Sequence, residues 1–190
     1  MTDSTPPNSQ WDLGERSTVY SSWWVELHLQ EVRQPDGRTY QHEVISVPRD
    51  GGGVIVIDDD ARALLIWRHR FITEQWGWEI PAGAFEEGED PAVGAARECL
   101  EETGWEPDSV RPLTAYFPSS GMSDQRLHIF LATSATERGA PVDRTEADAV
   151  AWRTKAEIED DLAAGNIPDG HAQMALVLGY ATIGSPLRWP

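Results

Sequence analysis

The stretch of sequence that decides the fold is residues 83–105, which read GAFEEGEDPAVGAARECLEETGW. The second half of this stretch predicts a short helix. Asp90 is a good N-cap, Pro91 suits the first helical position, and Gly104 suits a left-handed C-terminal cap. We therefore expect the helix to lie between Asp90 and Gly104.

The predicted helix has an acidic side and an apolar side. At about 100° per residue, Glu98, Glu101 and Glu102 fall within about one-third of the circumference. The opposite side, which we expect to be buried, carries Ala92, Val93, Ala96, Cys99 and Leu100. Carboxylates at these spacings repel one another, and Arg97 is the one cation of this stretch that could offset them. We therefore favour a divalent cation at this face, because Mg²⁺ takes one or two carboxylates together with waters and phosphate oxygens.

The spacing of the polar and glycine residues resembles the Nudix box. The matching positions are Gly83, Glu89, Arg97, Glu98, Glu101, Glu102 and Gly104, while Cys99 and Trp105 occupy two positions where aliphatic residues are commoner. The resemblance implies hydrolysis of a nucleoside diphosphate linked to another moiety, with Mg²⁺ or Mn²⁺. It also implies an α/β fold, namely an α/β/α sandwich with a mixed sheet.

The same resemblance assigns roles within the box. It implies that Glu98 and Glu102, with the backbone carbonyl of Ala82, hold the metal ion. Arg97 either binds phosphate or orients Glu98 or Glu101 and offsets the carboxylate charges, and we favour the second role. Glu89 either joins the metal network or pairs with Arg97.

Composition and charge narrow the class of protein. At 190 residues and 40% hydrophobic residues, the chain is long enough to bury one full core. The net charge of −17 opposes binding to nucleic acid or to an anionic membrane. It would also repel a free nucleotide, so the small nucleotide partner that the resemblance implies has to be met by a bound metal ion and local arginines. The single cysteine, the lack of an apolar run of about 20 residues and an N-terminus unlike a signal peptide favour a cytoplasmic enzyme.

The order of the expected elements gives one domain over residues 18–183, with a disordered tail at 1–17 and a short tail at 184–190. Strands are expected at 23–32 and 39–47, joined by the turn at 34–37, and these form an antiparallel N-terminal extension over 18–48. Strands at 54–57 and 63–70 are expected to pair as a hairpin. Further strands are expected at 111–117, 127–133 and 150–153, and further helices at 155–164 and 170–179.

Features outside the box resemble the ADP-ribose pyrophosphatase branch of the family. The N-terminal extension is similar to one that often contributes to a homodimer in that branch. Residues 63–71 resemble its arginine-bearing strand, so Arg70 is either a ligand of the substrate diphosphate or part of a surface ion pair. Residues 78–83 match the segment before the box, which makes Glu79 and Gly83 candidate substrate-binding residues. The implied substrate is ADP-ribose or a related nucleotide sugar, giving AMP and a sugar phosphate.

The loop at residues 118–125 departs from that branch, which commonly has a Ser-Pro-Gly loop ending in a catalytic glutamate. Ser120 replaces the proline, and Gln125 stands in the usual glutamate position. Because glutamine cannot act as a general base near neutral pH, either Asp124 or Glu101 is the candidate base.

Two other functions stay open. One is a nucleotide-pool enzyme that hydrolyses damaged triphosphates, and the other is a non-catalytic sensor of nucleotide sugars. Sensors of that kind usually lose carboxylates of the box, whereas all of them are present in this sequence.

Overall fold

The computed structural model describes residues 11–142 and 147–188. The contacts between residues divide the chain into two compact units. Unit 1 consists of Met1–Pro48 with Ser119–Gln125, and unit 2 consists of Arg49–Pro118 with Arg126–Pro190. The sequence predicted a single domain, but it did place the N-terminal strands in a separate extension.

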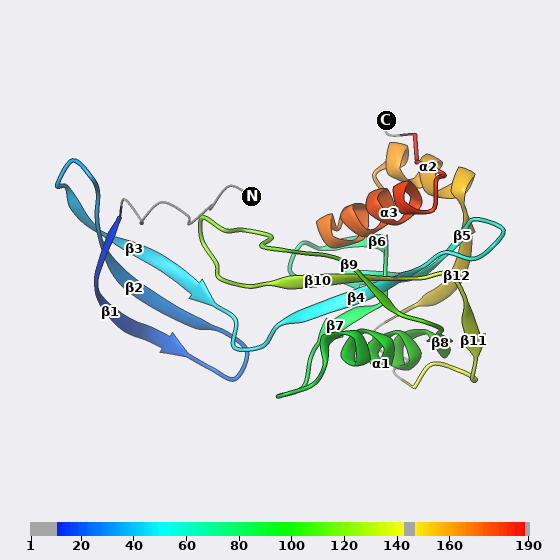
Figure 1. Ribbon diagram of the computed structural model, residues 1–190, viewed down its shortest axis with the longest axis horizontal. Coiled ribbons are helices and arrows are strands. Elements are labelled where there is room, and N and C mark those ends of the chain that lie inside the picture. The colour runs from blue at the N-terminus through cyan, green and yellow to red at the C-terminus, as the bar shows by residue number, and fades with distance from the viewer. Residues whose placement is uncertain (1–10, 143–146, 189–190) are drawn as a thin grey trace, which may run out of the picture. The chain divides into compact units, whose positions relative to one another are not determined.

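Unit 1 is an antiparallel sheet of three described strands in the order β1-β2-β3 (Figure 1). The strands are β1 (Asp12–Ser21), β2 (Glu26–Arg33) and β3 (Thr39–Ser46). The loop at 119–125 is attached to the end of β3, because Ile45 N–H donates to the Met122 carbonyl at 2.8 Å and Asp124 N–H donates to the Ile45 carbonyl at 3.2 Å. The loop that carries the candidate base Asp124 is thus held by the N-terminal sheet.

Unit 2 contains two larger sheets and a small one in its described part. A mixed four-stranded sheet has the order β7-β4-β10-β9, with β4 and β10 parallel. An antiparallel sheet has the order β12-β5-β6, and β11 pairs with β8. The strands are β4 (Gly51–Val56), β5 (Arg62–Arg70), β6 (Gln75–Glu79), β7 (Ala82–Ala84), β8 (Trp105–Pro107), β9 (Arg111–Tyr116), β10 (Leu127–Ala132), β11 (Ala135–Glu137) and β12 (Ala149–Thr154).

Three helices cover the two faces of these sheets: α1 (Pro91–Thr103), α2 (Lys155–Ala164) and α3 (Gly170–Thr182). Alternate residues of β4 belong to different apolar clusters. Val54 and Val56 pack in a cluster that includes Cys99 of α1, whereas Ile55 packs in a cluster that includes residues of α2 and α3. Such strands are buried on both faces, which explains their nearly continuous apolar sequence. Figure 1 shows α1 on one side of the strands and α2 and α3 on the other, so the expected α/β/α sandwich is confirmed.

Two expectations about the elements were wrong. Residues 12–17 belong to β1 rather than to a disordered tail, and residues 1–10 lie outside the described residues. The strands at 54–57 and 63–70 do not form a hairpin: β4 pairs with β7 and β10, and β5 pairs with β6 and β12, with only a single bridge between Ile57 and Ala63. The described part of the C-terminal tail is anchored, because the backbone N–H and the Nε of Arg188 both donate to the Glu159 carboxylate at 2.8 Å.

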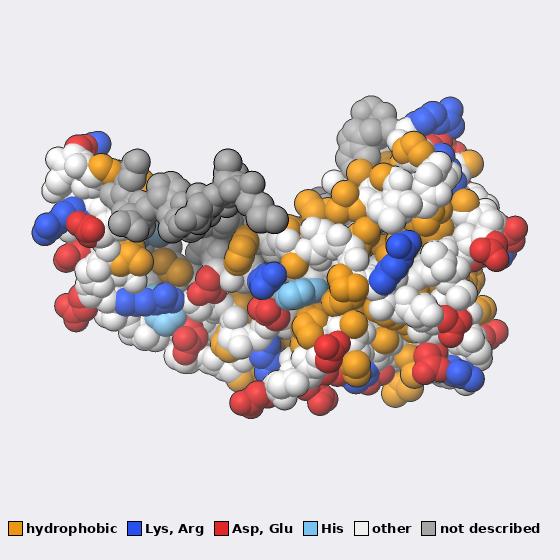
Figure 2. All heavy atoms as spheres, in the orientation of Figure 1, with side chains coloured by type: hydrophobic (Ala, Val, Ile, Leu, Met, Phe, Trp, Pro, Cys, Tyr) orange, Lys and Arg blue, Asp and Glu red, His pale blue; other side chains and the backbone are white. Residues whose placement is uncertain are grey.

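The surface carries both signs of charge. Figure 2 shows acidic and basic side chains interspersed over the face that it displays, although the net charge of the chain is −17. None of the helices within the described residues is long and apolar enough to cross a membrane.

Candidate active site

Helix α1 begins and ends where the sequence predicts. The Asp90 side chain accepts hydrogen bonds from the backbone N–H groups of Ala92 at 2.9 Å and Val93 at 3.3 Å. Gly104 caps the C-terminus in the left-handed region at φ 76°, and its N–H donates to the Leu100 carbonyl at 2.8 Å. The local capping chemistry therefore fixes the length of the helix that carries the acidic residues.

The buried side of α1 differs from the expected one. Its buried residues are Gly94, Ala95, Cys99, Glu102 and Thr103. Val93, expected to be buried, is 60% exposed, whereas Glu102, expected on an open acidic face, is only 2% exposed. The helix is thus rotated so that one of its carboxylates enters the interior. A buried carboxylate requires partners, and two of them are present.

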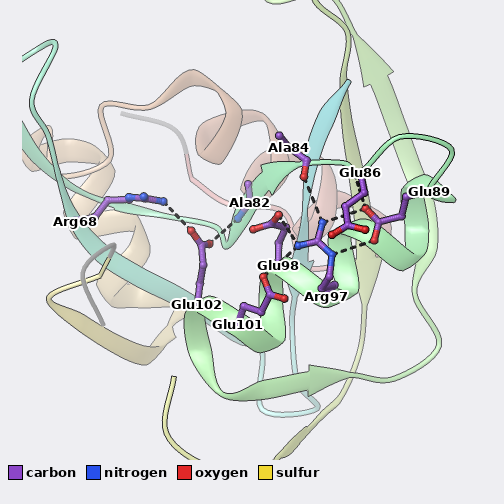
Figure 3. A network of polar contacts seen from close by, with 9 residues as sticks. All are labelled: Arg68, Ala82, Ala84, Glu86, Glu89, Arg97, Glu98, Glu101 and Glu102. Atoms are coloured by element: carbon purple, nitrogen blue, oxygen red, sulfur yellow. Dashed lines mark hydrogen bonds and ion pairs between the residues drawn. The ribbon is translucent and has the colours of Figure 1, made fainter. Parts of the chain in front are cut away.

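Arg68 of β5 and the backbone of Ala82 are partners of Glu102 (Figure 3). The Arg68 guanidinium donates to Glu102 Oε1 at 3.0 Å, and the Ala82 N–H donates to Oε2 at 2.9 Å. Sequence reasoning considered Arg97 as the offsetting cation and missed Arg68. The signal was available as the first of two arginines that follow the apolar run at 63–67, but its partner on α1 is set by the tertiary fold.

Strand β7 brings the backbone of Ala82 and Gly83 against α1. It pairs with the glycines of β4, where a side chain at Gly53 would collide with the Pro81 carbonyl. A Cβ atom at Gly83 would collide with the carboxylate of Glu98. Only glycine therefore permits Glu98 to lie so close to this strand. The carboxylates of Glu98 and Glu102 consequently lie against one short segment of backbone, from Ala82 to Gly83.

Arg97 joins the remaining carboxylates of the box (Figure 3). Its guanidinium donates to both oxygens of Glu89 at 3.0 Å each, to Glu98 at 2.8 Å and to Glu101 at 3.1 Å. It also donates to the Ala84 carbonyl at 3.3 Å, which ties the helix to β7. The contacts agree with the expected role of Arg97 in orienting Glu98 and Glu101. Of the two alternatives for Glu89, they favour pairing with Arg97.

The hydrogen bonds between Arg97 and Glu89 shift the pKa values of both groups. The pKa of Glu89 is lowered, first by the hydrogen bonds from Arg97 and then by the backbone N–H of Glu86, which donates at 2.8 Å. The pKa of Arg97 is raised, above all by its hydrogen bond to Glu89. Both groups are therefore charged at neutral pH, and the network is a set of ion pairs.

Arg70 and Glu79 form a second ion pair, between β5 and β6. Arg70 Nε and Nη2 donate to the two oxygens of Glu79 at 2.9 and 2.6 Å. The Glu79 side chain is buried at 5% exposure, and that of Arg70 is 49% exposed. The hydrogen bonds to Glu79 raise the pKa of Arg70. Glu79 thus fixes the position of Arg70, while half of the Arg70 side chain stays open to solvent.

Asp124, one of the two candidate bases, lies in unit 1 and has partners there. Its Oδ2 accepts a hydrogen bond from the Ser46 hydroxyl at 2.6 Å, and its Oδ1 accepts one from the Val47 N–H at 3.4 Å. Arg16 lies 4.0 Å from Oδ2. Glu101, the other candidate, has a side chain that is 43% exposed and one hydrogen bond from Arg97.

The donor set of the box suits a hard divalent cation. Within the described residues, no group of three or more His, Cys, Asp or Glu side chains is placed to hold a metal ion. Two carboxylates and one backbone carbonyl satisfy the requirement of Mg²⁺, which keeps several waters and binds phosphate oxygens. Glu98 and Glu102 meet at the backbone of Ala82 and Gly83, so the residues present fit such an ion.

Comparisons with known proteins identify the family of the chain. The profile of the NUDIX domain matches residues 47–174. A CMP-5'-(N-acetyl-N-hydroxy-3-aminopropyl)phosphonate hydrolase from Streptomyces rubellomurinus is 41% identical over 153 residues, covering 80% of this chain and 73% of that protein. An ADP-ribose pyrophosphatase from Bacillus subtilis is 31% identical over 117 residues, covering 62% of this chain and 63% of that protein, just under two thirds of its length.

A solved structure shares the fold. The crystal structure of an ADP compounds hydrolase matches with a TM-score of 0.82 at 19% identity, covering 93% of this chain and 95% of that one. The NUDIX match places the chain among hydrolases that generally use divalent metal ions. The chain belongs to the Nudix family, and it is a Nudix hydrolase of small nucleotide compounds.

Replacing Gly83 with alanine tests the contact between Glu98 and β7. The new Cβ occupies the place of the Glu98 carboxylate, so we expect that carboxylate to turn away and turnover to fall about 100-fold, the cost of a small misplacement at a reacting centre. Turnover and Mn²⁺ affinity are measured together with the melting temperature. Gly170→Ala is the matched control, since a Cβ there meets no atom within 4 Å. Equal activity of the two variants would contradict the assignment.

Proposed function

We propose that the chain hydrolyses the pyrophosphate bond of ADP-ribose or a related nucleotide sugar, giving AMP and a sugar phosphate. The observation that carries this proposal is the meeting of the Glu98 and Glu102 carboxylates at the backbone of Ala82 and Gly83. The ADP-ribose pyrophosphatase of Bacillus subtilis, with its 31% identity, supports the choice of substrate.

Glu98, Glu102 and the Ala82 carbonyl would hold Mg²⁺ or Mn²⁺. Such an ion, when bound, supplies positive charge to the pyrophosphate and lowers the pKa of water. Arg97 keeps Glu98 and Glu101 in fixed positions through its hydrogen bonds. The exposed part of Arg70 binds the substrate diphosphate, and Glu79 holds its guanidinium in place. Gly83 provides the space that Glu98 requires.

Glu101 is the general base in this proposal. It is on the same helix as Glu98 and Glu102, and 43% of its side chain is exposed, so it can reach a water molecule. Asp124 is the alternative, but its two oxygens already accept hydrogen bonds from Ser46 and Val47. Those bonds compete with the abstraction of a proton from water.

A CMP-linked phosphonate is the second candidate substrate. The observation that favours it is the 41% identity over 80% of this chain with a hydrolase named for such a compound. Both candidates contain a nucleoside monophosphate joined to a second acidic group. The roles proposed for the described residues concern this linkage and not the base.

Assays with both candidate substrates test the proposal. We expect AMP and ribose phosphate from ADP-ribose with Mg²⁺ or Mn²⁺, and no turnover by Glu98→Gln. Other nucleotide sugars, a CMP-linked phosphonate, dinucleoside polyphosphates and oxidised triphosphates complete the panel. Faster release of CMP from the phosphonate would select the second candidate, and faster hydrolysis of an oxidised triphosphate would select a pool-sanitising enzyme. Tight binding without any turnover would indicate a sensor.

The same assay distinguishes the two candidate bases. Glu101→Gln should lower kcat by about 10²- to 10⁴-fold, the usual range for removal of a general base. Asp124→Asn keeps the size of the side chain, and its effect should stay below about tenfold. The reverse order would assign the base to Asp124.

We further propose that the protein is a cytoplasmic homodimer. Strand β1 is exposed along its whole length, and Leu13, Val19 and Tyr20 are 71%, 59% and 57% exposed. Apolar side chains on a strand at the edge of a sheet are a surface for pairing with another chain. The lone cysteine, Cys99, is buried and free, which suits a reducing compartment.

Light scattering after size-exclusion chromatography tests the dimer. We expect the mass of two chains for the wild-type protein and of one chain for the double variant Leu13→Glu, Val19→Glu, because charges at these positions prevent the burial of β1. Glu15→Gln on the same strand is the control and should remain a dimer. A wild-type protein that elutes with the mass of one chain would refute the proposal.

A further inference from the structure

Arg68 is the one lysine or arginine among the buried side chains of the described residues. It is 8% exposed, and its partner Glu102 is 2% exposed. The two side chains come from different elements, β5 and α1, and their charged atoms lie 3.0 Å apart. Burial of two charges costs free energy that the attraction between them offsets only in part. An apolar pair would serve packing as well, so the presence of an ion pair at this point requires a reason.

The position of Glu102 gives that reason. Its two oxygens accept hydrogen bonds from Arg68 and from the N–H of Ala82. In the proposed function, this carboxylate is also a ligand of the divalent cation. A buried carboxylate without a neutralising partner is strongly destabilising. Arg68 therefore neutralises the Glu102 carboxylate in the metal-free protein, as the divalent cation does in the metal-bound protein.

The two cations oppose each other at this carboxylate. Arg68 is buried, so its guanidinium cannot move into water when a metal ion arrives. Repulsion between a divalent ion and a guanidinium at such short range corresponds to about tenfold or more in affinity. Arg97 differs, because its side chain is 26% exposed and its hydrogen bonds are spread over Glu89, Glu98 and Glu101.

We propose that Arg68 is a positioning residue that competes with the divalent cation for Glu102. It keeps this carboxylate in place in the metal-free protein and lowers the affinity for the metal ion when no substrate is bound. The inference rests on the proposed metal site, and it concerns a residue outside the box.

Metal binding in the absence of substrate tests the proposal. In Arg68→Met, Glu102 loses the hydrogen bond from the Arg68 guanidinium, so the melting temperature in EDTA should fall. Mn²⁺ should then raise the melting temperature by more than it does in the wild type. The dissociation constant for Mn²⁺, measured by electron paramagnetic resonance, should be about tenfold lower.

Arg153→Met is the matched control. Arg153 of β12 lies in the same sheet as Arg68 and pairs with the buried Asp161 of α2 at 2.6 Å. Its removal also breaks an ion pair with a buried carboxylate, but at a place where no metal ion is proposed. We expect a lower melting temperature with an unchanged response to Mn²⁺.

Arg68→Gln covers the case in which the methionine variant does not fold. Glutamine keeps an N–H donor for Glu102 but removes the positive charge, so the gain in Mn²⁺ affinity should persist. Unchanged or weaker Mn²⁺ binding by a folded Arg68 variant would refute the proposal that Arg68 competes with the cation for Glu102. A wild-type protein that binds no Mn²⁺ would overturn the metal site and this inference together, whereas Mn²⁺ binding without hydrolysis would refute only the proposed function.

Discussion

The contact of two glutamates of one helix with a single segment of backbone is the constraint on which the site depends. Glu98 lies where a Cβ of Gly83 would be, and Glu102 accepts the N–H of Ala82. The contact needs strand β7 close to α1, which the glycines of β4 allow. It also needs a helix of defined length, which Asp90 and Gly104 set. The functional geometry thus follows from the backbone as much as from the acidic side chains.

Charge balance is the second requirement. The chain has a net charge of −17, and the box adds carboxylates at spacings that repel. Arg97 offsets them at the exposed edge of the site, and Arg68 offsets Glu102 in the interior. The two arginines differ in burial: Arg68 is buried, whereas 26% of the Arg97 side chain is exposed. In the proposed function, a bound cation and Arg70 provide the attraction that brings a nucleotide to this site against the negative field of the protein.

Local sequence chemistry predicted much of this structure. The caps of α1, the bounds of α2 and the turn between β2 and β3 were correct, because each depends on residues close in sequence. The pairing of the 54–57 strand was wrong, since its partner β10 lies about 75 residues later in the chain and nothing local specifies it. Arg68 was missed for the same reason. Its hydrogen bond to Glu102 joins residues separated by 34 positions, and only the packing of α1 on β5 brings them together.

The position of a bound metal ion tests the central claim most directly. Crystals grown with Mn²⁺ and measured near its absorption edge should show an anomalous peak within about 2.5 Å of carboxylate oxygens of Glu98 and Glu102 and of the Ala82 carbonyl. A peak bound only by other residues, or no peak at saturating Mn²⁺, would contradict the account.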